Sequence, residues 1–123
     1  MSEKWLKHAH YDENIVVDEF WKKGYPALRL PVSGAGRFKG DVLAFLPHCI
    51  KLILIRRTET EDKITFEASE IQDVQNLAGR IAPLVYPNAV SIELKSHFPK
   101  QRRWIEKMLL DWDGKDIVVK VES

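Results

Sequence analysis

The chain has 123 residues, a formal net charge of +1, 45% hydrophobic residues and 30% charged residues. This length suits one compact domain with its own hydrophobic core and is too short for two, so we expect a single domain over residues 1–123. No apolar run approaches the roughly 18 residues of a membrane span, and the N-terminus lacks the apolar core of a signal peptide, which together predict a cytoplasmic chain without a membrane partner.

The first predicted element is a helix over residues 13–23. Val16, Val17 and Phe20 recur at helical spacing, and Gly24 follows two lysines, which is typical of a helix end. Short strands are predicted next, with a small-residue loop after the first of them that continues into a basic segment; the strands are expected at residues 25–30, 42–45, 50–56 and 63–66.

A second helix is predicted to run to about Ile81, with Ser69 as its N-cap and apolar residues at helical spacing. Residues 89–95 alternate apolar and polar side chains, which predicts a strand with one solvated face. Residues 102–112 fit either a strand or a short helix, and a terminal strand is expected at 116–121 after a turn. This order predicts an α/β fold with a mixed central β-sheet of about five strands flanked by helices.

The stretch from Lys22 to Gly34, with the pattern Arg-x-Pro-x-Ser-Gly at its end, is followed by Gly40-Asp41 before an apolar strand. Together these residues resemble the archaeal Holliday junction resolvases of the PD-(D/E)xK nuclease superfamily, over roughly residues 7 to 80. The resemblance implies a restriction-endonuclease-like fold, a role in DNA recombination and a homodimer, whose interface would draw on the aromatic residues Trp21, Phe98, Trp104 and Trp112.

The resemblance also assigns five catalytic positions, of which Glu13, Ser33, Asp41 and Arg56 carry polar residues here. Glu13 falls on the helix glutamate of the family, Ser33 on its active-site serine and Asp41 on its metal-binding aspartate. On the next strand, the spacing from Asp41 puts Leu54 where the family has a glutamate and Arg56 where it has a lysine.

Those two departures bear on the chemistry. Hydrolysis of a phosphodiester by this route needs hard oxygen ligands for Mg²⁺ and a lysine near the attacking water. Leu54 offers no ligand atom, and the planar guanidinium of Arg56 does not simply replace an ammonium. With Glu13 and Asp41 alone we expect weak metal binding at most, no cofactor, and Mg²⁺ only if nuclease activity survives.

The small net charge means that DNA binding must depend on local basic clusters. The candidate DNA-binding residues are Lys7, Arg29, Arg37, Lys39 and Arg57, with Arg102 and Arg103 as a second cluster. Acidic residues accumulate where active relatives tend to carry basic ones, at Glu59, Glu61, Asp62, Glu67 and Glu70.

The sequence leaves three functions open. The first is a catalytically impaired resolvase-like protein that binds branched or duplex DNA, is nucleoid-associated, and regulates or accompanies an active nuclease or repair protein. The second is a protein-interaction module on a nuclease fold with residual DNA affinity. The third is an active endonuclease with a rebuilt site. In that site Glu93 and Lys95 would join Glu13 and Asp41, since they form a Glu-x-Lys pair on one strand face.

Overall fold

The computed structural model describes residues 3–30 and 39–121, without the side chains of residues 3–9. Within these ranges the order of elements is α1 (Glu3–Lys22), β1 (Ala27–Arg29), β2 (Val42–Leu46), β3 (Cys49–Arg57), β4 (Lys63–Phe66), α2 (Ala68–Val85), β5 (Ala89–Phe98), the 3-10 turn η1 (Pro99–Gln101), β6 (Arg103–Met108) and β7 (Ile117–Lys120). The predicted helices and strands are therefore all present, and residues 102–112 form a strand for most of their length.

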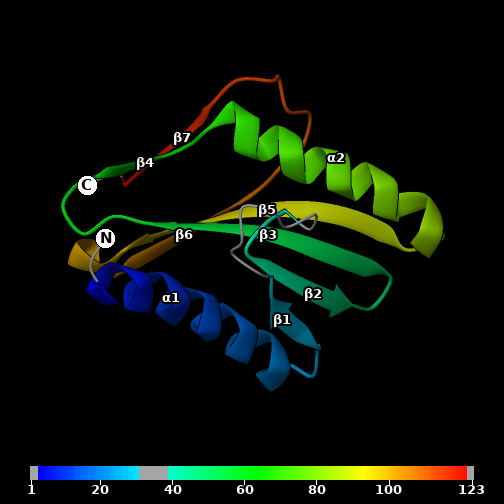
Figure 1. The fold of residues 1–123 in the computed structure, drawn as a ribbon, viewed down its shortest axis with the longest axis horizontal. Helices are drawn as coiled ribbons and strands as arrows, with labels where there is room; N and C mark the ends of the chain where they lie inside the picture. Colours follow the sequence, from blue (N-terminus) through cyan, green and yellow to red (C-terminus); the bar gives the residue numbers. More distant parts are fainter. Residues whose placement is uncertain (1–2, 31–38, 122–123) are drawn as a thin grey trace.

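Five strands form one mixed sheet in the order β1-β2-β3-β5-β6, with α1 on one face and α2 on the other (Figure 1). Among the described strands only β3 and β5 pair in parallel, and α2 provides the crossover that a parallel pair needs. The strands β4 and β7 pair in a separate two-stranded sheet beside α2. The predicted mixed α/β fold is confirmed.

Each face of the five-stranded sheet has its own hydrophobic core. The larger core lies on the α2 face and includes Leu52, Leu54 and Phe66, whereas Ile53 and Ile55 join Val16 of α1 in the smaller core on the opposite face. The alternation along β3 therefore sends successive side chains to different layers, as a central strand requires. A helix packed on each face makes β3 the middle of the molecule.

Three local predictions were wrong. The helix α1 starts ten residues earlier than predicted, because its first half is rich in charged residues and carries no clear apolar periodicity. The N-cap of α2 is Glu67, so Ser69 lies inside the helix and does not cap it. The strand β5 has no solvated face over Glu93 and Lys95, which are both only 5% exposed.

Two of the aromatic residues predicted to form a dimer interface are tied into the fold. Phe98 is fully buried in the larger core, and the Trp104 ring stacks on His97. Trp112 also packs against the larger core, while Trp21 is exposed. The predicted interface therefore loses Phe98, because its ring fills the core. In the part of the chain that the structure describes, no helix is long and apolar enough to cross a membrane.

Candidate functional site

The candidate site forms where β2 and β3 separate. Their pairing ends at Val42 and Ile53, and the Asp41 amide still donates to the Ile53 carbonyl at 2.9 Å. β3 then continues without β2 beside it, and Asp41 Oδ2 accepts a hydrogen bond from the Ile55 amide at 2.7 Å. The Asp41 carboxylate thus replaces the missing strand as the hydrogen-bond partner of β3, which fixes its position.

Arg56 extends from β3 toward this carboxylate and toward α2. Its Nη1 lies 3.2 Å from Asp41 Oδ2 and 2.8 Å from the Ile55 carbonyl oxygen. Its Nη2 forms an ion pair with Glu70 in the first turn of α2, and its guanidinium carbon lies 6.0 Å from the centre of the Phe66 ring. A single guanidinium therefore neutralises carboxylates from two elements and links β3 to α2.

Glu13 approaches the same site from α1. Its side chain is 5% exposed, and burial, reinforced by the negative charge of Asp41, raises the pKa of the Glu13 carboxyl to about 7, although Arg29 and Arg56 oppose the shift. Burial also raises the pKa of Asp41, against the hydrogen bond from Ile55 and the charge of Arg56. The predicted partners Glu13, Asp41 and Arg56 are thus brought into one electrostatic group.

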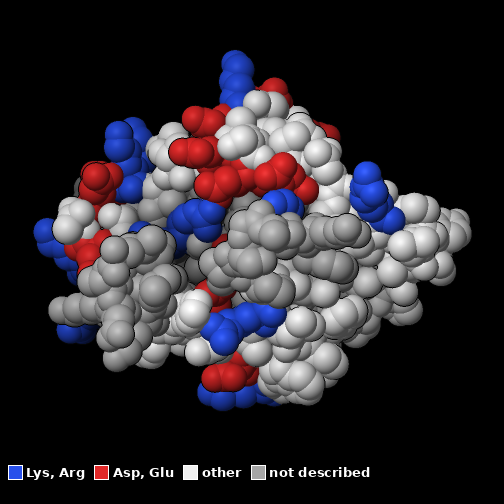
Figure 2. Space-filling view, viewed as in Figure 1, with Lys and Arg blue, Asp and Glu red and all other residues white. Residues whose placement is uncertain are grey.

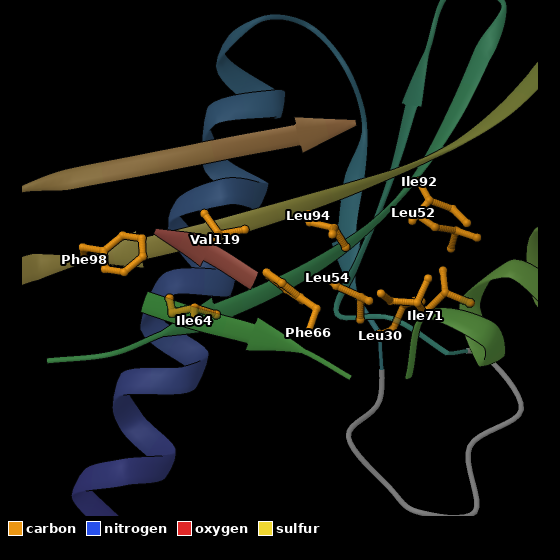
Figure 3. Close-up of a cluster of buried hydrophobic side chains, with 11 residues drawn as sticks. Leu30, Leu52, Leu54, Ile64, Phe66, Ile71, Ile92, Leu94, Phe98 and Val119 are labelled. Carbon is orange, nitrogen blue, oxygen red and sulfur yellow. The ribbon is translucent and has the colours of Figure 1, made fainter. Parts of the chain in front are cut away.

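Leu54 points into the larger core instead of into this group. It is 4% exposed and lies among Leu30, Phe66, Ile71 and Leu94 (Figure 3). The side chain lies on the same face of β3 as that of Arg56, two residues further on, so a polar group at this position would have pointed toward the α2 side of the site. The leucine instead extends the core to the edge of the site.

The resemblance to the resolvases implies a divalent metal ion, and these residues do not fit one as they are arranged. One oxygen of Asp41 is already occupied by the Ile55 amide and Arg56, and Arg56 also holds Glu70. Leu54 supplies no donor atom, and no group of three or more His, Cys, Asp or Glu side chains within residues 10–30 and 39–121 is placed to hold a metal ion. The guanidinium supplies the positive charge that an ion would otherwise bring.

The basic candidates fall into three groups. Arg29 is exposed at the end of β1, and Lys39 is half-buried just before Asp41, so both flank the site. Arg57 instead donates to Asp12 at 3.0 Å and to Glu59 at 2.8 Å, which commits its guanidinium to internal ion pairs. Ser33, Arg37 and the side chain of Lys7 lie outside the described residues.

The partner of Arg57 is a buried acidic residue beside the site, and the sequence interpretation gave it no contact. Asp12 is 1% exposed, and one of its carboxylate oxygens lies 3.0 Å from both Arg57 Nη1 and His97 Nδ1. His97 in turn stacks on Trp104, with ring centroids 4.2 Å apart. The consecutive acids Asp12 and Glu13 in the sequence were the available signal, since two neighbouring helix residues can reach different sides of a strand end.

Glu93 and Lys95 form a second charged group, on the α1 face of the sheet. Glu93 bonds to Lys51 and to Lys95, each at 3.0 Å, and Lys95 also bonds to Glu106 at 2.6 Å. Burial raises the pKa of Glu93, but its lysine partners outweigh burial and leave the pKa below its usual value; the pKa of Lys95 is raised by its glutamate partners despite burial.

This second group borders a cavity of about 130 Å³, which is also lined by Glu19 and Phe20 of α1 and by Lys23 just after the helix. Glu13 lies six residues earlier on the helix than Glu19, so the two sites occupy different turns of α1. The structure therefore brings Glu93 and Lys95 together with Lys51 and Glu106 rather than with Asp41.

Charges of both signs share the molecular surface around these sites. On the face seen in Figure 2, acidic side chains gather just below the α2 layer, and basic side chains lie between and beside them. The ion pairs Arg56–Glu70 and Arg57–Glu59 are two instances in which a predicted acidic position neutralises a neighbouring arginine.

A five-stranded mixed sheet with a helix on each face and an aspartate where two strands separate matches the restriction-endonuclease-like nuclease fold. The chain is similar in structure to Hjc from Archaeoglobus fulgidus, described as a Holliday junction resolvase from an archaeal hyperthermophile, with a TM-score of 0.68 and 18% sequence identity. The match covers 88% of this chain and 84% of that chain. No protein-family model matches the sequence, and no curated protein does. At this identity the similarity establishes the fold.

Proposed function

We propose that this chain is a catalytically impaired, resolvase-like protein that binds branched or duplex DNA without cutting it. The observation that supports the proposal is the position of Arg56, whose guanidinium holds Asp41 and Glu70 while Leu54 packs in the core. This guanidinium engages one oxygen of Asp41 and the Glu70 carboxylate, and it brings positive charge to the place where a metal ion would bind.

The DNA contacts would come from the residues that flank this site. Arg29 pairs with Val42, the residue after Asp41, and Lys39 precedes Asp41 by two residues, so both side chains would meet backbone phosphates near the site, with Arg37 from the preceding segment as a further candidate. Contacts of this kind bind charge and shape without reading sequence. We propose that the chain works as a homodimer beside an active nuclease or a repair protein.

A gel-retardation and cleavage assay tests this proposal. Purified protein is incubated with a labelled four-way junction and with linear duplex, in Mg²⁺, in Mn²⁺ and in EDTA. We expect equal retardation with and without metal, no cleavage product, and binding that weakens steeply as salt rises. Arg29→Ala with Lys39→Ala should weaken binding about tenfold or more, whereas Lys115→Ala with Lys120→Ala, which removes the same charge elsewhere, should not.

Two outcomes would contradict the proposal. Metal-dependent cleavage that disappears in Asp41→Ala would mean that the site still works as a nuclease. Absence of retardation at low salt would leave the second candidate function, a protein-interaction module. That alternative is favoured by Leu84 and Tyr86 at the end of α2, two large apolar side chains that are each 83% exposed. Analytical ultracentrifugation of the same samples measures the expected dimer.

A further inference from the structure

The short turn between β5 and β6 carries several positively charged side chains. Residues 99–105 carry Lys100, Arg102 and Arg103 and contain no acidic residue, and all three cations are exposed. The turn lies at the end of the sheet toward which β3 runs, at the left of Figure 1. Basic side chains are also visible along this end in Figure 2, with some acidic ones among them. We call residues 99–103 the basic turn.

The basic turn is held in place on both sides. Before it, Phe98 is fully buried in the larger core, and after it Trp104 stacks on His97. Within it, the Arg102 amide donates to the Pro99 carbonyl at 3.0 Å and closes the 3-10 turn. Cations carried on a braced turn lose less conformational freedom on binding than cations on a free loop.

Arg102 occupies a position that suits other residues better. Its backbone is left-handed, with φ 53° and ψ 46°. Glycine and asparagine adopt this conformation readily, whereas a side chain such as arginine is strained there. Asparagine is therefore the replacement at this position that removes the positive charge and also suits the backbone.

The strand register places the basic turn relative to the proposed DNA-binding residues. Arg29 pairs with Val42, Val42 with Ile53, and Ile53 with Glu93, so Arg29 lies level with Glu93 on β5. From there β5 runs about six residues further to the basic turn. With a strand rise of about 3.3 Å and a strand spacing of about 4.8 Å, the two groups are roughly 25 Å apart. One turn of B-DNA is about 34–36 Å long, so a single duplex can reach both.

We propose that the basic turn is a second DNA-contacting element, in which Lys100 and Arg102 bind backbone phosphates of the duplex that Arg29 and Lys39 hold near Asp41. This inference rests on the proposed DNA-binding function and adds to it a second, distant anchor. The charge complementarity is local, because the chain as a whole has a net charge of only +1. Two anchors on one duplex orient it across the end of the sheet, whereas one anchor leaves it free to turn.

The test uses Lys100→Gln with Arg102→Asn in the full chain. Asparagine tolerates the left-handed backbone, so we expect thermal stability equal to or higher than that of the unchanged protein. Affinity for linear duplex at low salt should fall about tenfold or more. The slope of log affinity against log salt should become shallower by about 1.8, since each lost phosphate contact accounts for about 0.9. The single variant Arg102→Lys should keep most of the affinity of the unchanged protein for duplex, because the contact depends on positive charge.

The control is Lys115→Ala with Lys120→Ala, which removes two exposed cations outside the basic turn and should change neither the affinity for duplex nor the salt slope. If the unchanged protein binds duplex and the basic-turn variant binds with the same affinity and slope, the inference fails and the proposed function stands. If the unchanged protein does not bind DNA at all, the proposed function itself fails and takes this inference with it.

Discussion

At the level of single residues, Leu54 contributes to the hydrophobic core and offers no atom that could bind a metal ion. It fills the space between Leu30, Phe66 and Ile71, at the edge of a group of ionised side chains. We expect Leu54→Ala to lower the free energy of unfolding by about 2–5 kcal/mol, because a fully packed side chain leaves a cavity. Urea denaturation measures the change. Leu84→Ala, at a position 83% exposed, should change it by less than about 0.5 kcal/mol; a similar small loss at Leu54 would mean that this side chain is not part of the core.

Glu13 is the residue whose ionisation should affect stability most visibly. Its pKa is about 7 in the folded chain against a usual value of 4.5, so between these pH values the folded chain keeps a proton that the unfolded chain has released. The stability that this proton contributes is complete below about pH 4.5 and is lost as pH rises to about 7.

Glu13→Gln removes that dependence. At pH 4.5 the variant and the unchanged protein should be equally stable, and at pH 8 the variant should be more stable by on the order of 1–3 kcal/mol, because it has no charge to bury. Denaturation curves at both pH values measure the difference. A constant difference between the two proteins from pH 4.5 to pH 8 would show that Glu13 ionises normally in the folded state.

At the level of elements, the attachment of α1 depends on a buried charged contact. Asp12 bonds to Arg57 at the end of β3 and to His97 on β5, so one carboxylate holds the helix against two strands. We expect Asp12→Asn to cost about 1–3 kcal/mol, since it removes the buried one of the two counter-charges of Arg57, which keeps its ion pair with Glu59. Amide hydrogen exchange should speed up along α1 first. Asp18→Asn, exposed on the same helix, is the control and should leave both measurements unchanged.

The elements themselves were largely predictable, and their environments were not. Apolar periodicity predicted both helices and every strand of the five-stranded sheet except β6, whose residues fitted either a strand or a short helix, because each predicted element must bury a face or a stripe. It could not predict that Glu93 and Lys95 are buried, since alternation of polar and apolar residues normally marks a solvated face. Pairing with Lys51 and Glu106 makes that burial tolerable, and those partners lie on strands that only the tertiary structure brings together.

Contacts between residues of one chain segment were predicted for the candidate site, and contacts with other elements were not. Spacing along one chain segment placed Asp41 and Arg56 together, because they lie on adjacent strands of a hairpin. The ion pair between Arg56 and Glu70 joins a strand to a helix across a turn and a further strand, and no local pattern announces it. Arg57 was predicted to bind DNA from its charge alone, and its internal partner Asp12 lies 45 residues away.

At the level of the whole molecule, the sheet, the two helices and the separated strands β2 and β3 are those of the nuclease fold, while the charge at the site is arranged differently from a metal centre. Positive charge is built into the chain at Arg56 and displayed at both Arg29 and the basic turn. In the function that we propose, phosphate contacts do not depend on metal ligation, because backbone contacts and metal ligation use different residues.

This separation predicts that metal binding can be introduced without changing the fold. Leu54→Glu with Arg56→Lys removes the guanidinium from between Asp41 and Glu70 and adds a carboxylate on the same face of β3. The double variant should be less stable than the unchanged protein without metal, because a core leucine is lost. With Mn²⁺ at about ten times its dissociation constant it should regain about 1.4 kcal/mol.

Thermal denaturation with Mn²⁺ and with EDTA measures this difference, and the unchanged protein should show none. Leu54→Glu alone is the matched control: with Arg56 still bound to Asp41, the new carboxylate gains a cationic neighbour instead of an ion, so Mn²⁺ should stabilise it much less than the double variant. Equal stabilisation of the two variants by Mn²⁺ would mean that the Arg56 guanidinium does not exclude the metal. The leucine at position 54 alone would then account for the weak metal binding of the unchanged protein.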